Sequence, residues 1–251
     1  MQGPKQTVRV AAVGDLHYGK SSRGTLQTLF AALTRVEADV LILCGDLTDY
    51  GLPEEAAELA RELVSGVAIP IVGVLGNHDY ESGASVEITR LLSEAGVKVL
   101  DGETVEVHGI GFAGVKGFAG GFGRGALGPW GEEVVKHFVQ EAVAEALKLE
   151  SALARLRTPT RVAILHYAPI AATVEGEPRE IYPWLGCSRL EEPLARYEVT
   201  AVFHGHAHHG APHGKTMNGT PVYNVSLPLL LAENAEQPLR VLDLPVTTIP
   251  S

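Results

Sequence analysis

Short apolar runs recur along the chain, and the segments between the first of them have helical periodicity. Several runs are apolar at every position, which is typical of strands that are covered on both faces. The runs that we expect to form strands are Val8–Val13, Val40–Cys44, Ile69–Leu75, Val105–Val115, Arg161–Leu165, Val199–Phe203, Pro221–Val225 and Leu239–Leu244.

Between the runs, the apolar residues recur with the spacing that is typical of helices. The segment Leu26–Val36 keeps one apolar face, and Pro53 followed by Glu54 and Glu55 is typical of a first helical turn. A longer helix is expected from about Glu132 to Leu156. Strands that alternate with helices, followed by a strand-rich second half, predict an α/β domain whose sheets lie between helices.

The composition is that of an ordinary globular protein. The 251 residues are 45% hydrophobic and 20% charged, and this length fits one large domain or two small ones. No repeat, charge tract or linker divides the chain, so we expect a single domain over residues 1–251. The formal net charge of −10 argues against a broad surface for nucleic acid or anionic membrane, since both need clustered Lys and Arg.

The two cysteines, Cys44 and Cys187, are too few for a disulfide framework, and Cys44 lies in an apolar run. The first residues, Met1–Gln6, lead into an apolar run that is too brief for the core of a signal peptide. No stretch approaches the roughly 18 apolar residues of a membrane span. We therefore expect a soluble cytoplasmic protein.

A glycine-rich stretch, Lys116–Gly131, precedes the long helix. Within it, Gly123–Gly128 matches the pattern GxGxxG, but Pro129 and Trp130 intervene before the helix, whereas a dinucleotide site needs a direct strand-to-helix turn. A cofactor loop, a mobile loop beside a site and a plain connection are the three alternatives. Arg124 is a candidate phosphate contact in this stretch.

Five apolar runs are followed at once by polar residues of a restricted kind. The five segments are Gly14-Asp15-Leu16-His17, Gly45-Asp46-Leu47-Thr48-Asp49, Gly76-Asn77-His78-Asp79, His166-Tyr167-Ala168-Pro169 and His204-Gly205-His206-Ala207-His208. Turns favour Gly, Asn, Asp and Pro, but they give no reason for histidine in four of the five segments. In open α/β sheets the carboxyl ends of strands form the ligand crevice, so these segments can converge. Imidazole with carboxylate suits Zn, Fe or Mn.

The ordered blocks DLH, GD, GNHD, H and GHAH, from Asp15 to His208, resemble the calcineurin-like metallophosphoesterase family. The resemblance implies a four-layer α/β/β/α sandwich with two mixed sheets and two metal ions. It also implies a ligand set in which Asp15, His17 and His208 hold one ion, Asn77, His166 and His206 hold the other, and Asp46 bridges both.

The same resemblance implies hydrolysis of a phosphoester by metal-bound hydroxide. His78 is then the candidate general acid, and Asp49 matches the position that pairs with it, orients the ring and raises its pKa. For Asp79 a cap or turn role and a supporting role behind the ligands stay open.

Other polar residues are weaker candidates. His204 is a plausible supporting group beside the ligands, whereas His108 and His137 are expected on the surface or in packing. Tyr223 and Asn224 end a late strand and could approach the site.

Some residues differ from those found in known branches of the metallophosphoesterase family, and these differences bear on the substrate. Tyr50 stands where the protein Ser/Thr phosphatase branch has an arginine, which disfavours a protein substrate. The segment GDLTDYG followed by GNHD is similar to bacterial phosphodiesterases, including class III cyclic nucleotide enzymes, although Tyr167 replaces one imidazole of their histidine pair. A small phosphodiester is therefore the expected substrate. The alternatives are a phosphomonoester, an interaction scaffold that binds metal, and a nuclease with a local basic patch. The stretches Lys116–Gly131 and Thr173–Cys187 are the expected contributors to selectivity.

Overall fold

The computed structural model describes residues 6–19 and 23–246, and the chain forms two mixed β-sheets there. The first sheet has the strand order β11 (Arg240–Pro245), β1 (Thr7–Val13), β2 (Val40–Cys44), β3 (Ile71–Val74) and β4 (Val97–Val99). Strands β1 to β4 are parallel, and β11 pairs with β1 in the antiparallel direction. The carboxyl ends of four strands therefore lie at one edge.

The second sheet is also mixed, with parallel strands at its centre. Its order is β5 (Thr104–Val107), β6 (Ile110–Gly114), β7 (Thr160–Ile164), β8 (Ala201–His204), β10 (Pro221–Asn224) and β9 (His213–Lys215). The four central strands are parallel, and the two edge strands are antiparallel to their neighbours.

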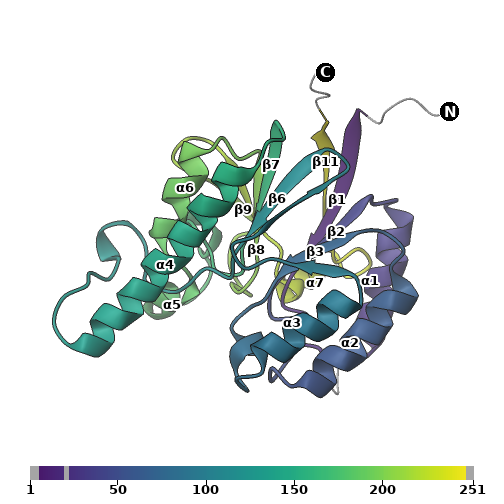
Figure 1. Ribbon diagram of the computed structural model, residues 1–251, viewed down its shortest axis with the longest axis horizontal. Helices are drawn as coiled ribbons and strands as arrows, with labels where there is room; N and C mark the ends of the chain where they lie inside the picture. Colours follow the sequence, from purple (N-terminus) through teal and green to yellow (C-terminus); the bar gives the residue numbers. More distant parts are fainter. Residues whose placement is uncertain (1–5, 20–22, 247–251) are drawn as a thin grey trace.

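Helices cover the outer faces of both sheets (Figure 1). Beside the first sheet lie α1 (Arg23–Arg35), α2 (Pro53–Gly66) and α3 (Ser85–Glu94); beside the second lie α4 (Glu133–Arg155), α5 (Tyr182–Leu185) and α6 (Glu191–Arg196). Helix α7 (Leu227–Glu233) follows β10, and short 3-10 turns form η1 (His78–Tyr80), η2 (Gly123–Gly125), η3 (Ala171–Thr173), η4 (Arg179–Ile181) and η5 (Ser188–Leu190). The expected α/β class with two mixed sheets between helices is confirmed.

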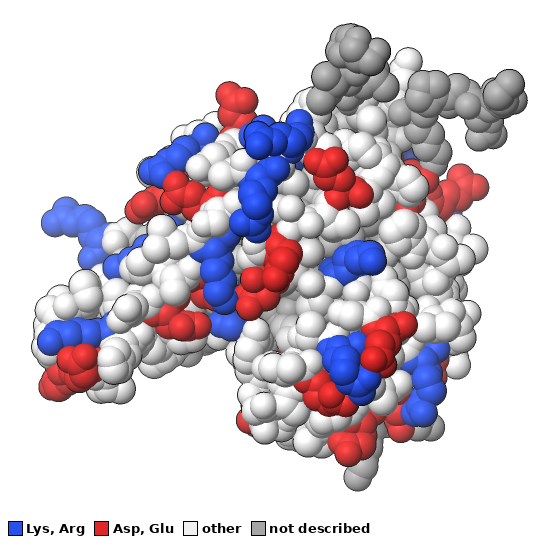
Figure 2. Space-filling model, viewed as in Figure 1, with Lys and Arg blue, Asp and Glu red and all other residues white. Residues whose placement is uncertain are grey.

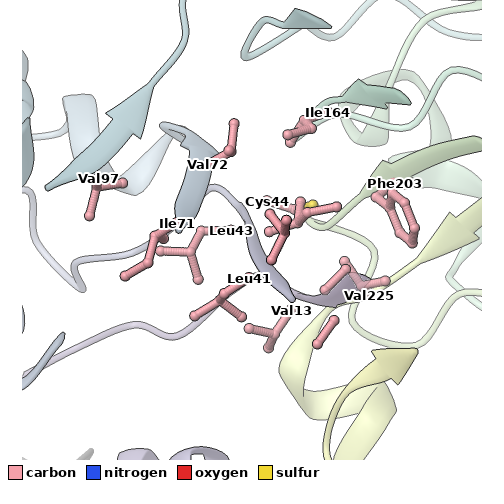
Figure 3. Packing of buried hydrophobic residues seen from close by; sticks show 14 of the residues in the cluster. Val13, Leu41, Leu43, Cys44, Ile71, Val72, Val97, Ile164, Phe203 and Val225 are labelled. Atoms are coloured by element: carbon pink, nitrogen blue, oxygen red, sulfur yellow. The ribbon is translucent and has the colours of Figure 1, made fainter. Parts of the chain in front are cut away.

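The main core lies between the two sheets. Figure 3 shows Val72 and Cys44 of the first sheet on the side of Ile164 and Phe203 of the second. All five residues of β2 are buried, because helices cover one face of their sheet and the other sheet covers the second face. The continuously apolar runs have this cause.

Several elements differ from the sequence-based expectation. The run Val105–Val115 is a hairpin rather than one strand, because His108 and Gly109 both take left-handed backbone angles (φ 52° and 81°) and reverse the chain. Strands β4 and β9 were not predicted; each has three residues, too few for an alternation to be visible. Helices α3, α5, α6 and α7 were also not predicted.

The glycine-rich stretch does not lead a strand directly into a helix. It contains the short turn η2, and α4 begins only at Glu133, so it lacks the geometry of a dinucleotide fingerprint. Cys44 and Cys187 are both free and buried. The segment Met1–Gln6, on which the expectation of no signal peptide rests, lies outside the described residues except for Gln6. Of the helices in the described ranges, none combines the length and apolar character that crossing a bilayer requires.

Candidate metal centre

The seven side chains expected to bind metal form two neighbouring groups. Asp15, His17 and His208 place one ligand atom each within 4.8 Å of one another, and so do Asp46, His166 and His206. The seventh, Asn77, joins the second group through its Oδ1, which lies 2.9 Å from His166 Nε2. The loops after β1, β2, β3, β7 and β8 supply them, so the parallel strands of both sheets deliver their polar ends to one place.

Asp46 lies between the two groups and turns one oxygen to each. Its Oδ2 is 3.9 Å from His17 Nε2, and its Oδ1 is 3.4 Å from His166 Nε2. The carboxylate is 1% exposed. Burial alone would raise its pKa, but the charge and hydrogen bond of His166 outweigh this and hold the pKa of Asp46 well below its usual range. Asp46 is therefore anionic and placed to bridge.

Main-chain carbonyls fix which ring nitrogens face the centre. His166 Nδ1–H donates to the Cys44 carbonyl at 2.9 Å, and His206 Nε2–H donates to the Trp184 carbonyl at 3.2 Å. His166 Nε2 and His206 Nδ1 then face each other at 3.1 Å. A carbonyl partner on the far nitrogen is the usual way in which proteins orient a metal-binding imidazole.

The pKa values of two histidines in the centre are shifted in opposite directions. Burial lowers the pKa of His166, but the Asp46 carboxylate outweighs it and raises the value to about 9. His206 has its pKa lowered to about 4, by burial first and then by the neighbouring His166. The Asp46 carboxylate thus favours the charged form of His166, and His166 in turn favours the neutral form of His206.

Asp15 holds the first ligand group together. Its Oδ1 lies 3.0 Å from His208 Nε2, and both of its oxygens accept the His206 main-chain N–H, at 3.0 and 2.9 Å. The hydrogen bond that His208 donates to the Asp15 carboxylate raises the pKa of His208. One carboxylate thus ties the loop after β1 to the loop after β8.

The backbone of the ligand loops is strained. Asp15, His17, Asp46 and His206 have φ values of 57°, 42°, 48° and 70°, in the left-handed region that residues with a Cβ rarely adopt. Such strain persists where surrounding structure over-determines it, and it concentrates at functional sites. Four of the seven ligand candidates share this feature.

Glycines beside the ligands allow the loops to approach closely. A Cβ on Gly76 would lie 2.2 Å from Asp46 Oδ1, one on Gly205 would lie 2.3 Å from Asp15 Oδ2, and one on Gly45 would lie 2.6 Å from His166 Nδ1. Each of these glycines adjoins a carboxylate or imidazole of the centre, so a Cβ at any of the three positions would displace a ligand side chain.

His78 and Asp49 lie beside the first group, in an arrangement that differs from the expected pair. His78 Nδ1–H donates to the main-chain carbonyl of Asp49 at 2.7 Å, while the Asp49 carboxylate lies 3.3 Å from His17 Nδ1. The rings of His17 and His78 meet edge to face at 4.5 Å. Asp49 therefore contacts His78 through its main-chain carbonyl and His17 through its carboxylate.

Asp79 braces the loops that carry two ligands. Its Oδ1 accepts the N–H and hydroxyl of Thr48 at 2.8 and 2.6 Å, and its Oδ2 accepts the N–H groups of Gly76 and Leu47 at 2.8 and 3.2 Å. The side chain is fully buried, and burial together with the Asp46 charge raises its pKa. The sequence left open a cap or turn role and a supporting role behind the ligands for Asp79. This geometry favours the supporting role, in which Asp79 braces the ligand loops.

Other candidates lie near the centre without entering it. His204 is buried with its Nε2 2.8 Å from the Thr173 hydroxyl, and Asn224 donates to the Ala207 carbonyl at 2.7 Å. Both stabilise the last ligand loop from behind. His108 and His137 are exposed, as expected. The carbonyls of Cys44 and Trp184 were not predicted, because every residue has a carbonyl and the sequence carries no signal for them.

The donor set fits a pair of transition-metal ions. It combines three types of ligand atom that Zn, Mn and Fe accept: imidazole nitrogen, carboxylate oxygen and amide oxygen. Two buried carboxylates, Asp15 and Asp46, lie among the imidazoles, and main-chain carbonyls engage the far nitrogens of His166 and His206. Fold and site together thus define the class: an α/β protein with a candidate centre for two metal ions.

The comparisons with known proteins agree with this class. The profile of the calcineurin-like phosphoesterases matches residues 8–210, and the chain belongs to that family. Comparison with curated proteins gave no match.

Two solved structures share the fold. Phosphopantetheinyl hydrolase from Mycobacterium tuberculosis is 16% identical with a TM-score of 0.67, over 94% of this chain and 96% of that one. A putative 5'-nucleotidase from Staphylococcus aureus is 17% identical with a TM-score of 0.54, over 87% of this chain and 48% of that one. At these identities the likeness concerns the fold alone.

Proposed function

We propose that the protein is a dinuclear metal-dependent phosphohydrolase that cleaves a small phosphodiester. The observation that carries the proposal is the position of Asp46, whose two oxygens face His17 and His166 in different ligand groups. A carboxylate that serves two sites at once is the feature that a pair of ions needs and a single ion does not.

Asp15, His17 and His208 would hold one ion, Asn77, His166 and His206 the other, and Asp46 both. When bound, such a pair of Mn, Fe or Zn ions supplies an activated water and positive charge for the phosphoryl oxygens. The left-handed loops and the carbonyl-fixed imidazoles hold these ligands in place before any ion binds.

His78 is the proposed general acid. Its Nδ1 is engaged by the Asp49 carbonyl, so Nε2 is the nitrogen that would protonate the leaving oxygen. The Asp49 carboxylate, at 3.3 Å from His17 Nδ1, would instead orient a ligand. Asp49 therefore serves both rings in this proposal, each through a different group.

The charge at the centre favours a diester over a monoester. Within residues 6–19 and 23–246, no Lys or Arg side chain hydrogen-bonds or pairs with the ligands Asp15, Asp46, Asn77, His166, His206 and His208. A phosphomonoester carries close to two negative charges at neutral pH, whereas a diester carries one and needs less positive charge beyond the metals. Figure 2 shows acidic and basic side chains interspersed over one face of the molecule rather than a broad basic surface.

The test is hydrolysis of bis-p-nitrophenyl phosphate and p-nitrophenyl phosphate by metal-stripped protein that is resupplied with Mn, Fe or Zn. We expect metal-dependent turnover of the diester, and we expect Asp46→Asn to lose it together with bound metal. Turnover of the monoester alone would mean that the substrate is a phosphomonoester and not a phosphodiester. Bound metal without turnover of either would favour the scaffold alternative.

The acid role of His78 is tested separately with His78→Gln. We expect the variant to keep its metal content by mass spectrometry and to lose about 10²–10⁴-fold in turnover, the usual contribution of a general acid. The loss should be larger for methyl p-tolyl phosphate than for bis-p-nitrophenyl phosphate, because a poor leaving group needs the proton more. Equal losses of metal and activity would assign His78 to the metal ligands instead.

A further inference from the structure

A cavity of about 340 Å³ lies between the ends of β3 and β4 and the start of the glycine-rich stretch. Its walls include Leu75, Tyr80, Leu100 and Lys116, together with the carboxylates Asp101 and Glu103. Tyr80 belongs to the same 3-10 turn as the proposed acid His78, so one short turn connects the cavity wall to the metal centre.

Lys116 is the cation of this cavity, and aromatic rings surround it. Its ammonium lies 4.8 Å from the ring centre of Phe118, 5.4 Å from that of Tyr167 and 5.6 Å from that of Tyr80. It donates one hydrogen bond of 2.8 Å, to the Gly117 carbonyl. Burial lowers the pKa of Lys116, since the rings displace water without supplying a full negative charge.

Two of the carboxylates around Lys116, Glu145 and Asp101, are engaged by other groups, and Glu141 is a third nearby carboxylate. Glu145 accepts the Gly117 N–H at 2.8 Å and pairs with Lys148 at 2.7 Å, and Asp101 pairs with Lys148 at 2.9 Å. Within residues 6–19 and 23–246, no carboxylate lies within 4.0 Å of the Lys116 ammonium. A largely buried cation without a counter-ion is costly unless a ligand supplies one.

One aromatic ring separates Lys116 from the metal centre. The Tyr167 ring lies 4.5 Å from that of His206 and 5.4 Å from that of His166, centre to centre, while Lys116 lies over the same ring. Tyr167 follows the ligand His166 directly and fixes the spacing between the two. Lys116 and the ligands His166 and His206 therefore lie against the same aromatic ring.

We propose that Lys116 binds a second anionic group, a carboxylate or phosphate, on the part of the substrate that does not react. This inference rests on the proposed function, because it assumes that the reacting phosphoryl group binds at the seven ligands. The substrate class is then a phosphodiester with a second negative charge and an apolar or aromatic segment between the two. Leu75, Tyr80 and Leu100 provide the apolar wall for that segment.

The test uses methyl esters of ω-carboxyalkylphosphonic acids, which carry one charge on phosphorus and hold the carboxyalkyl chain by a P–C bond that hydrolysis leaves intact. A series with two to six methylenes scans the distance to Lys116. The methyl ester of the alkylphosphonic acid of equal length, which keeps the phosphorus charge and lacks the carboxylate, is the match for each. Titration calorimetry gives the dissociation constants for manganese-loaded wild-type protein, Lys116→Met, Lys116→Arg and Lys98→Met. Lys98 is exposed in β4 and controls for the loss of one positive charge.

We expect the carboxylated compound of at least one length to bind at least tenfold more tightly than its match. Lys116→Met should abolish this difference in affinity, and it should weaken the compounds without a carboxylate by no more than twofold. Lys116→Arg and Lys98→Met should retain the difference. No difference at any length, or an undiminished difference in Lys116→Met, would overturn the proposal. Equal weakening of both compound classes in Lys116→Met, or a large fall in its melting temperature, would assign Lys116 a structural role and overturn it too.

The outcome is separable from that of the proposed function. Binding of the phosphonates with a Lys116-dependent difference in affinity but without hydrolysis of any phosphodiester would retain the anion subsite and reject the enzyme. Hydrolysis of bis-p-nitrophenyl phosphate without the difference in affinity would retain the enzyme and reject the subsite.

Discussion

Replacing Asp79 by asparagine is expected to destabilise the protein strongly, although the two side chains have nearly the same shape. The carboxylate accepts four hydrogen bonds, two at each oxygen, from Thr48, Gly76 and Leu47. An amide has one oxygen, and its NH₂ group must face donors. If the NH₂ faces Thr48, the hydroxyl can turn and accept, but the Thr48 N–H stays unsatisfied. If it faces the other side, two main-chain N–H groups lose their acceptor.

The magnitude follows from the better of these two orientations. One buried donor without an acceptor costs about 1–3 kcal/mol, and the bonds that remain lose the strength that a charged acceptor provides. The expected loss in the free energy of unfolding of Asp79→Asn is therefore about 2–4 kcal/mol. For a chain of this size, that corresponds to a fall in melting temperature of roughly 5–15 °C.

The assay is urea unfolding of Asp79→Asn and wild-type protein in EDTA, so that metal binding does not contribute. Glu236→Gln, the same chemical change at an exposed position, is the control and should stay within about 0.5 kcal/mol of wild type. If Asp79→Asn matched that control, the bracing role would be refuted. Its metal affinity should fall as well, because Thr48 and Gly76 flank the loops of Asp46 and Asn77.

Two further predictions concern the metals. Manganese at about 100 times its dissociation constant should add roughly 2.7 kcal/mol per ion to the free energy of unfolding; differential scanning calorimetry with and without EDTA measures this, and Asp46→Asn should show little of the gain. Gly76→Ala should lose both ions, because its Cβ would displace the shared Asp46, whereas Gly205→Ala, which displaces Asp15, should lose one. Metal content by mass spectrometry distinguishes them, with Gly125→Ala, where a Cβ meets nothing within 4 Å, as the control; one ion lost in both variants would contradict a bridging Asp46.

The sequence predicted most of the strands and the residues that follow them, for local reasons. Runs such as Val40–Cys44 are apolar at every position because both faces are covered, and that property is visible in any window of five residues. The polar ends were informative because histidine has no role in ordinary turns. Asp15 and His208 are 193 positions apart and follow strands of different sheets. Strand ends were expected to converge on one crevice, but the pairing of these two residues was expected only from the resemblance to the metallophosphoesterase family.

Contacts that depend on side-chain direction or on the main chain were decided by the tertiary structure. Whether Asp49 offers His78 its carboxylate or its carbonyl depends on where His17 stands, and no spacing in the sequence encodes that choice. The carbonyls that orient His166 and His206 belong to residues whose identity does not matter for the bond.

The surroundings of Lys116 show the same limit most clearly. Its three aromatic neighbours come from different segments of the chain, and the carboxylates nearest to it are taken by Lys148. The sequence by itself determined which residue types would reach the ends of the strands, because periodicity and spacing are local. Only the folded chain decided which of their atoms meet and which charge is left without a partner, because those are properties of distances between segments far apart in the sequence.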